Sequence, residues 1–479
     1  MFLWLALAAG LGQSSVDWPQ FRGPNGSGVG PAVEIAPEFG PDKGARWVAD
    51  VPPAHSSPIV AGDRIFLTAV EGGARKQLAP GRVVDPDGKL ITLCLDRKTG
   101  KPLWRREVPR PRVEMYQPTN SPASPSPVTD GKTLYVFFGD FGILAYDAAT
   151  GKERWKLPLG PFNNPNGHGS SPVLAGNLVV LLCDQDDHSF LIAVDKASGK
   201  VKWKVDRPES TRSYSTPGVF GTGKDAELIV PGAFTLISYR VETGEKLWWV
   251  NGLSWQPKSS PVIDGRMIYA HWWEAGGENE SATVTEAFED VVKVRDADGD
   301  GKLRASELDE RMRRGFDDMD LNHDGAVDAR EWEFYRARRA SRNALLSIQH
   351  GERGDLTSSK SIVWRMQKFL PNVPTPLLYD GVMYLIKDGG ILSAVDAKTG
   401  EVLKQGRLTG ALDTYYASPV AAGGRIYFLS QTGKLSVVNA GGRDWELLRV
   451  NDFGEDTFST PALAGGRLYV RTRTKLYAF

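Results

Sequence analysis

A serine-proline or threonine-proline pair followed by an apolar run occurs eight times in the 479 residues, and this repeat limits the fold more than any other feature. The intervals between successive pairs are 69, 45, 45, 44, 115, 43 and 42 residues. Five nearly equal intervals predict a repeating unit, and the two long ones predict insertions of about 25 and about 70 residues. The first residues of the pairs are Ser57, Ser126, Ser171, Thr216, Ser260, Thr375, Ser418 and Thr460.

A tight turn followed by a tryptophan keeps the same phase. It reads DRKTGKPLW, DAATGKERW, DKASGKVKW and VETGEKLW in four successive units, ending at Trp104, Trp155, Trp203 and Trp248. Glycine allows the positive φ that such a turn needs, and the Asp and Ser/Thr side chains can hydrogen-bond the turn backbone. A large apolar side chain at one position in each unit predicts packing between neighbouring units.

Each unit then holds four short strands, and eight such units predict an all-β fold, an eight-bladed β-propeller. The last unit ends one strand short, while GARWVADV (Gly44–Val51) has the form of a tryptophan strand with no unit before it. We expect these N- and C-terminal strands to complete one blade and close the ring, which removes exposed sheet edges. The predicted propeller occupies residues 45–274 and 343–479, and residues 13–44 form an N-terminal extension.

The interruption of blade five, residues 275–342, contains two segments that match EF-hand calcium loops, DADGDGKLRASE and DLNHDGAVDARE. This spacing wraps short carboxylates or amides around the ion, glycine at position six permits the sharp turn, and the final glutamate supplies two oxygens. A solvated loop is the alternative, but two full matches flanked by amphipathic helices favour a small α-helical EF-hand pair with two calcium ions. The predicted ligands are Asp296, Asp298, Asp300, the Lys302 carbonyl and Glu307, and then Asp320, Asn322, Asp324, the Ala326 carbonyl, Asp328 and Glu331.

The two loops differ in charge. Position nine is Arg304 in the first loop and Asp328 in the second, so we expect the second loop to bind calcium more tightly. The 12-residue spacer between the loops predicts one shared helix.

Strand connections in an antiparallel blade alternate between the two faces of the ring, so both insertions should share a rim with the blade-to-blade connections. The residue two positions before each repeated Ser or Thr should circle the channel there, as in a binding funnel. The alternative is that these side chains only plug the channel mouth. The candidate funnel residues are His55, Ser124, Tyr214, Lys258, Tyr416 and Phe458, with His168 beside them and Gly169 and Val373 completing the ring.

Other side chains offer weaker candidates. A structural hydrogen bond is a stronger interpretation than catalysis for His55 and His168. DQDDH (Asp184–His188) could chelate a metal, but a solvated hairpin turn is favoured. Cys94 and Cys183 lie in apolar runs and should be buried free thiols. We find no Ser-His-Asp signature, phosphate loop or zinc spacing, so no catalytic residue is predicted.

The net charge limits the classes of binding partner, and the N-terminal residues predict the cellular location. Lys plus Arg (58) equals Asp plus Glu (58), which gives no electrostatic support for nucleic-acid or anionic-membrane binding. Residues 1–12 predict a cleaved signal peptide, no cysteine before Cys94 could carry a lipid anchor, and no later stretch could span a bilayer. We expect a periplasmic or secreted monomer without a nucleic-acid partner.

The repeats over residues 45–479 and the leader DWPQFRGPNGSGVG (Asp17–Gly30) resemble the PQQ-repeat propellers, a group with quinoprotein alcohol dehydrogenases and the outer-membrane assembly factor BamB. In the enzymes of this group, PQQ lies between a tryptophan and a ring formed by two adjacent cysteines, with a calcium ion nearby. The resemblance implies the same residues for any PQQ site in this chain. This chain has no adjacent cysteines, so PQQ is not expected. We favour an exported calcium-binding propeller that acts as a binding or scaffold module for a protein or polysaccharide. The alternative is a PQQ-dependent alcohol or sugar dehydrogenase with its ligand in the funnel.

Overall fold

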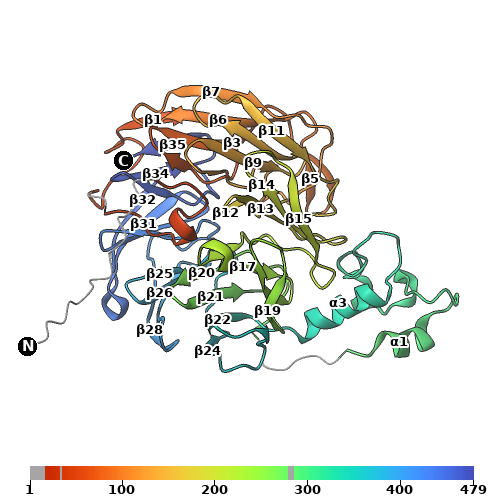
Figure 1. The fold of residues 1–479 in the computed structure, drawn as a ribbon. Helices are drawn as coiled ribbons and strands as arrows, with labels where there is room; N and C mark the ends of the chain where they lie inside the picture. Colours follow the sequence, from red (N-terminus) through yellow and green to blue (C-terminus); the bar gives the residue numbers. More distant parts are fainter. Residues whose placement is uncertain (1–16, 33–34, 279–284) are drawn as a thin grey trace, which may run out of the picture.

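Each repeat unit folds into an antiparallel four-stranded sheet, and eight such sheets follow one another around a ring (Figure 1). The computed structural model describes residues 17–32, 35–278 and 285–479, so the predicted signal peptide at residues 1–12 lies outside the described residues. The all-β, eight-bladed propeller that the repeat predicts is confirmed.

Blades one to four follow the chain order. Blade one holds β2 (Ile59–Ala61), β3 (Arg64–Glu71), β6 (Lys89–Asp96) and β7 (Pro102–Glu107), with the hairpin β4 (Lys76–Ala79) and β5 (Arg82–Val84) between its second and third strands. Blade two holds β8 (Val128–Thr129), β9 (Thr133–Phe138), β10 (Gly142–Asp147) and β11 (Glu153–Pro158). Blade three holds β12 (Val173–Ala175), β13 (Leu178–Cys183), β14 (Phe190–Asp195) and β15 (Val201–Asp206). Blade four holds β16 (Gly218–Phe220), β17 (Glu227–Gly232), β18 (Thr235–Arg240) and β19 (Lys246–Asn251), and β23 (Gly354–Asp355) pairs in parallel with β19.

Blades five to eight complete the ring. Blade five holds β20 (Val262–Asp264), β21 (Met267–Trp272), β22 (Ala344–Gln349) and β24 (Ile362–Met366). Blade six holds β25 (Leu377–Tyr379), β26 (Val382–Lys387), β27 (Ile391–Asp396) and β28 (Val402–Arg407), and blade seven holds β29 (Val420–Ala422), β30 (Arg425–Leu429), β31 (Lys434–Asn439) and β32 (Glu446–Asp452). Blade eight joins β33 (Ala462–Ala464), β34 (Arg467–Arg471) and β35 (Lys475–Ala478) to β1 (Trp47–Asp50), so the two ends of the propeller share one blade as predicted.

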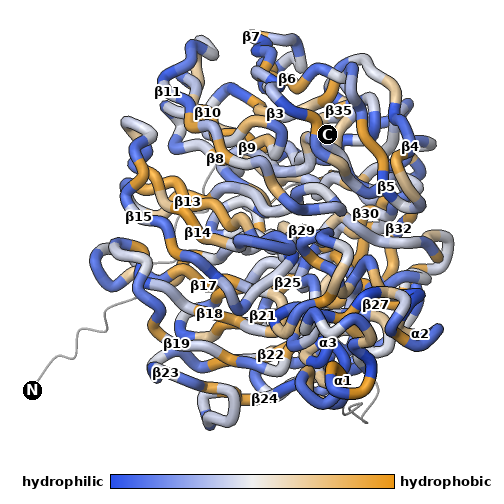
Figure 2. The backbone as a smooth tube through the Cα atoms, turned by 90° about the vertical axis from the view of Figure 1, so that its right-hand side faces the viewer, coloured by the Kyte–Doolittle hydropathy of each residue, from blue (hydrophilic) through white to orange (hydrophobic). Residues whose placement is uncertain are grey.

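The middle strands of the blades are buried on both faces. All six residues of β9 are buried, and the hydrophobic segments in Figure 2 concentrate in middle strands such as β13, β14 and β17. The outer strand β15 instead alternates exposed and partly buried residues. This pattern follows from the ring, because each blade packs between two neighbours while its outer strand meets solvent.

The repeated Ser and Thr hydroxyls link neighbouring blades. The Ser57 N–H donates to Ser126 Oγ (2.9 Å), and the Ser126 N–H donates to Ser171 Oγ (2.9 Å). Links of the same kind recur at five more of the blade junctions, ending with the Thr460 N–H, which donates to Ser57 Oγ (3.0 Å), while Ser260 Oγ has no hydrogen-bond partner among the described residues. Seven of the eight hydroxyls therefore accept a hydrogen bond from a buried backbone N–H of the preceding blade, which explains the preference for Ser or Thr at this position.

The tryptophan of one blade covers the turn glycine of the next, which confirms the predicted packing between units. Trp104 Nε1 donates to the Ala148 carbonyl (3.1 Å), and a Cβ added at Gly151 would lie 2.6 Å from the Trp104 ring. Trp248 departs from this arrangement and donates to Glu227 Oε2 (3.0 Å) within its own blade. Blade five has no Asp-x-x-Thr-Gly turn for Trp248 to cover.

The helical insertion, residues 285–342, lies between β21 and β22 and projects from one side of the ring (Figure 1). It contains α1 (Phe288–Arg295), η3 (Ala305–Glu307), α2 (Glu310–Arg313), η4 (Phe316–Asp318) and α3 (Ala329–Ala340). The predicted single shared helix is wrong, because the spacer forms only α2 and a 3-10 turn, with the poor helix former Gly315 between them. The insertion has its own core of Phe288, Val291, Leu303, Leu308, Met319, Val327 and Trp332.

Residues 17–30, the N-terminal plug, lie across the inner strands of blades one and seven. Trp18 bridges to Val60 and Val29 bridges to Ala421, and the plug contains the 3-10 turn η1 (Pro24–Gly26). Trp18 and Arg22 are fully buried. The predicted N-terminal extension is therefore packed into the propeller.

Candidate functional site

A cavity of about 480 Å³, the funnel cavity, is walled by the loops that join one blade to the next. Most of the repeated Ser and Thr residues line it, together with the ring of residues two positions before them. That ring consists of His55, Ser124, Gly169, Tyr214, Lys258, Val373, Tyr416 and Phe458. The eight equivalent positions of the repeat therefore meet in one place.

His168 lies outside this wall. Its ring packs edge-on against Phe162, with centroids 4.7 Å apart, and its Nε2 lies 3.2 Å from Glu114 Oε2. The glycine that follows it occupies the ring position instead, so the side chain turns toward blade two.

One part of the wall is aromatic. The rings of His55 and Phe458 stack with centroids 4.2 Å apart, and Tyr416 lies 5.0 Å from Phe458. Burial, with the charges of nearby arginines, lowers the pKa of His55 to about 3. Its imidazole is therefore neutral at physiological pH, and the wall offers a flat aromatic surface for a ligand.

Lys258 brings a positive charge to the wall. Burial lowers the pKa of its ammonium to about 8, against the opposing effect of the Glu274 charge. Within the described residues, the ammonium has no hydrogen bond or ion pair. The Glu274 carboxylate is instead held by Arg338 Nε at 2.6 Å. An uncompensated cation in a concave wall favours an anionic ligand.

Polar atoms in the wall also lack partners. Across the described part of the chain, Asn166 Oδ1, Asn372 Oδ1 and Trp273 Nε1 are buried without a hydrogen bond. Buried polar groups nearly always have one. The wall therefore has unused capacity to accept and donate hydrogen bonds.

The helical insertion leaves blade five and docks on blades three and four. Asn163 Nδ2 donates to the Leu321 carbonyl (2.7 Å), and Phe334 stacks on Phe234 with centroids 6.1 Å apart. Arg338, from α3, lies over the Trp255 ring at 4.0 Å and lines the funnel cavity. The insertion thus supplies a side chain to the wall.

The segment Asp184–His188 forms part of this docking surface, and its interpretation as a solvated turn is wrong for Asp184–Asp186, which are buried, while His188 is exposed. Asp184 pairs with Arg207 at 2.8 Å, with both side chains fully buried. Asp186 is buried and pairs with Arg212, which also reaches Asp318 of the insertion at 3.5 Å. Sequence reasoning missed Arg207 and Arg212 because both lie in the loop after β15, outside the local Asp184–His188 pattern.

The second loop of the insertion is more buried than the first: Asp320, Leu321 and Glu331 at its ends are buried, while residues 322–325 are exposed. Glu331 Oε1 accepts the N–H of Leu321 (2.8 Å), and Glu331 Oε2 accepts that of Asp328 (2.9 Å). Asp320 Oδ2 accepts the Gly325 N–H (2.9 Å), where Gly325 has φ +87°. Burial raises the pKa of Glu331. The final glutamate therefore faces the first residues of its loop.

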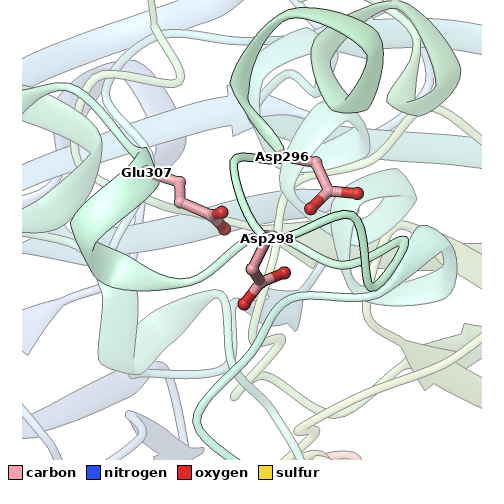
Figure 3. A group of neighbouring side chains, drawn as sticks. All are labelled: Asp296, Asp298 and Glu307. Atoms are coloured by element: carbon pink, nitrogen blue, oxygen red, sulfur yellow. The ribbon is translucent and has the colours of Figure 1, made fainter.

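The first loop repeats this pattern in an exposed position. Glu307 Oε1 accepts the Ala297 N–H (2.7 Å) and Asp296 Oδ2 accepts the Gly301 N–H (2.9 Å). Oxygens of Asp296, Asp298 and Glu307 lie within 4.8 Å of one another, and Figure 3 shows the three carboxylates converging. Oxygen ligands at such spacing suit calcium.

Cationic side chains contact the carboxylates of both loops. Arg304 Nε lies 3.0 Å from Asp298 Oδ2, and Nη2 of the same guanidinium pairs with Asp300 Oδ2. Lys302 Nζ of the first loop lies 2.7 Å from Asp324 Oδ2 of the second. Hydrogen bonds from these cations lower the pKa values of Asp298 and Asp324. The loops also pair through Leu303 and Val327 (N–O 3.0 and 2.8 Å), as sister calcium loops would.

The two cysteines lie in different blades, Cys94 in β6 and Cys183 in β13, and both are buried and free as predicted. Burial raises the pKa of Cys94 to about 12. Neither lines the funnel cavity. The resemblance implies a ring of two adjacent cysteines beside PQQ. The described wall contains no cysteine, so it does not fit PQQ held in that way.

Two further cavities border the funnel. One of about 710 Å³ shares His55 and Phe458 with it, and one of about 830 Å³ shares Phe21 of the N-terminal plug.

No helix in the described parts of the chain is long and apolar enough to cross a membrane.

Three solved structures of similar fold differ in what their names say they do. BamB from Moraxella catarrhalis matches with a TM-score of 0.53 at 11% identity, over 90% of this chain and 97% of its own. A europium-containing methanol dehydrogenase matches with a TM-score of 0.57 at 10% identity, over 96% of this chain and 97% of its own. Quinohemoprotein alcohol dehydrogenase from Comamonas testosteroni matches with a TM-score of 0.57 at 11% identity, over 97% of this chain and 80% of its own. At such low identity these likenesses show the fold alone.

No curated protein matches the sequence. The model of the family described as outer membrane protein assembly factor BamB matches residues 40–180, 87–251 and 335–479. These matches cover most of the propeller and leave out residues 252–334, which include β20, β21 and most of the helical insertion. The chain therefore belongs to the family described as outer membrane protein assembly factor BamB.

Proposed function

We propose that this protein is an exported calcium-binding propeller that acts as a binding module, with the funnel cavity as its ligand site. The helical insertion is an EF-hand pair that holds two calcium ions. One observation carries the proposal: both loops close on a final glutamate with the same hydrogen-bond pattern, and the second loop leads directly into the helix that lines the funnel.

The donor set fits calcium. Each loop offers carboxylate or amide oxygens at positions one, three and five, a main-chain carbonyl at position seven and a glutamate at position twelve. Gly301 and Gly325 have φ of +79° and +87°, which permits the turn at position six. With calcium bound, the final glutamate of each loop, Glu307 or Glu331, would draw the two ends of that loop together.

The second loop connects calcium to the funnel. Glu331 lies in the first turn of α3, and Arg338 follows it by seven residues, about 10 Å along the helix. Asp318, just before the loop, pairs with Arg338 at 3.2 Å and with Arg212 at 3.5 Å. Calcium in the second loop would therefore hold both ends of this contact, and binding in the funnel should depend on calcium.

The wild-type chain is expected to bind two calcium ions in a calorimetric titration. Glu331→Gln and Glu307→Gln should each weaken one site by about 100-fold or more, because each removes a bidentate ligand. The control is Glu333→Gln on α3, which changes an exposed carboxylate paired with Arg336 and should leave both sites intact. A wild-type chain that takes up no calcium would contradict the proposal.

Arg304→Gln is expected to tighten calcium binding at the first loop by about 3- to 10-fold, since the ion would no longer displace a cation from Asp298 and Asp300. The control is Arg314→Gln, whose partner Glu310 is more exposed and lies outside the loops. Calorimetry on the Glu331→Gln background isolates the first site. Unchanged affinity would show that Arg304 does not compete with the ion.

A further inference from the structure

We propose that the funnel cavity binds a small hydroxylated carboxylic acid, an acidic sugar such as a uronic acid, whose carboxylate pairs with Lys258. This inference rests on the proposed function in taking the funnel as the ligand site, and it adds the chemical class of the ligand.

The charge of the wall selects the sign and size of the ligand charge. Its ionisable side chains other than tyrosines are Lys258, Arg338, Glu274 and the neutral His55. Because Glu274 and Arg338 pair at 2.6 Å, the ammonium of Lys258 is the charge that remains unpaired among the described residues of the wall. One uncompensated positive charge matches one carboxylate. A phosphate dianion would need a cluster of arginines or a helix N-terminus directed at it.

The rest of the wall selects a hydroxylated ring. Asn166 and Asn372 have amide oxygens without donors, and ligand hydroxyls can supply them after small side-chain rotations. Tyr416, Phe458 and His55 form a flat apolar surface against which the C–H face of a sugar can pack. At about 480 Å³ the cavity falls within the range of small-molecule sites.

Lys258 lowers the stability of the fold at this position, because its ammonium is partly buried without a counter-charge among the described residues. This cost supports a role in binding. An ammonium that is partly buried without a partner disfavours its own charged form. A methionine would fill the same space without that cost. Residues that lower stability in a cavity wall are typical of functional sites.

The test is calorimetric titration of the calcium-loaded full chain with D-glucuronate, D-glucose and inorganic phosphate at pH 7.0. Glucuronate should bind at least about 10-fold more tightly than glucose, because a charged hydrogen bond adds to the shared hydroxyl contacts. Lys258→Met should abolish that preference, while the control Lys224→Met, exposed and outside the funnel, should keep it.

The pH dependence provides a second readout. Glucuronate needs the charged ammonium, so its affinity should be nearly constant below pH 8 and fall by up to about 10-fold per unit above it. The other groups near Lys258 should not titrate in this window: burial holds the pKa of His55 and of His271 at about 3 and raises that of Tyr214. Lys258→Met should bind with no such pH dependence.

The outcomes separate this inference from the proposed function. Two bound calcium ions together with equal affinity for glucose and glucuronate, or tighter binding of phosphate, would overturn the acidic-sugar assignment and leave the calcium module standing. Glucuronate binding that Lys258→Met leaves unchanged would overturn the assignment of the residue and of the site. Failure to bind calcium would contradict the proposed function, whatever the saccharides do.

Discussion

Arg212→Met is expected to lower the free energy of unfolding by about 3–5 kcal/mol, because it leaves the Asp186 carboxylate buried without its counter-charge. Asp186 is fully buried and Arg212 is 1% exposed, so water cannot replace the lost partner. Burial already raises the pKa of Asp186 against the pull of Arg212. Denaturant titration at pH 7 measures the loss.

The same substitution should disconnect the helical insertion from the funnel. Arg212 contacts Asp318 at 3.5 Å and lies 5.0 Å from the Trp255 ring, whose centroid is also 4.0 Å from Arg338. Calcium should still bind both loops of the variant, since no ligand is altered. Calcium should no longer change ligand affinity in the funnel.

Two controls define this result. Arg314→Met removes a guanidinium from an exposed pair and should change stability by less than about 0.5 kcal/mol. Arg212→Met combined with Asp186→Leu removes both charges and should recover much of the stability without restoring the calcium effect. The stability loss of the single variant should also shrink as pH falls, because a protonated Asp186 needs no counter-charge. A single variant as stable as the wild type would contradict the interpretation.

The propeller could be predicted because its determinants recur at fixed positions along the chain. Ser57 and Ser126 differ by one repeat and hydrogen-bond directly, so the sequence period is also the spatial period of the ring. Trp104 and Gly151 are related in the same way. For this reason the residues two positions before each repeated Ser or Thr converge on one cavity, as expected from a closed ring.

The docking of the insertion could not be predicted, because it breaks the repeat. Arg212 and Asp318 are separated by 106 residues, and their contact depends on how the insertion turns once it leaves blade five. Asp184 and Asp186 have the local pattern of a solvated turn, and only the arrival of Arg207 and Arg212 makes burial favourable. His168 faces Glu114 for a similar reason, since its partner comes from another blade.

The N-terminal plug was also beyond the sequence pattern, and Arg22 holds it. The guanidinium donates to the carbonyls of Gly26 and Ser27 within the plug and to those of Thr375, Pro376 and Pro419 in the propeller, at 3.0–3.3 Å. Burial without a carboxylate lowers its pKa to about 9. The hydrogen bonds must therefore outweigh the cost of burying the charge.

Arg22→Met is expected to release the plug, because it leaves these carbonyls without donors at about 1 kcal/mol or more each, offset in part by removal of the buried charge. A net loss of about 3 kcal/mol corresponds to roughly 100-fold faster amide hydrogen exchange in residues 17–30 and at the Ala421 N–H, which bonds the Gly28 carbonyl. Exchange mass spectrometry measures this directly, with Arg46→Met, an exposed arginine, as the control.

Phe21 lines both the funnel cavity and the cavity of about 830 Å³ beside it, so release of the plug should join the two cavities and weaken ligand binding in the funnel. Unchanged exchange in residues 17–30 would mean that the strand bridges of Trp18 and Val29, and not Arg22, hold the plug in place.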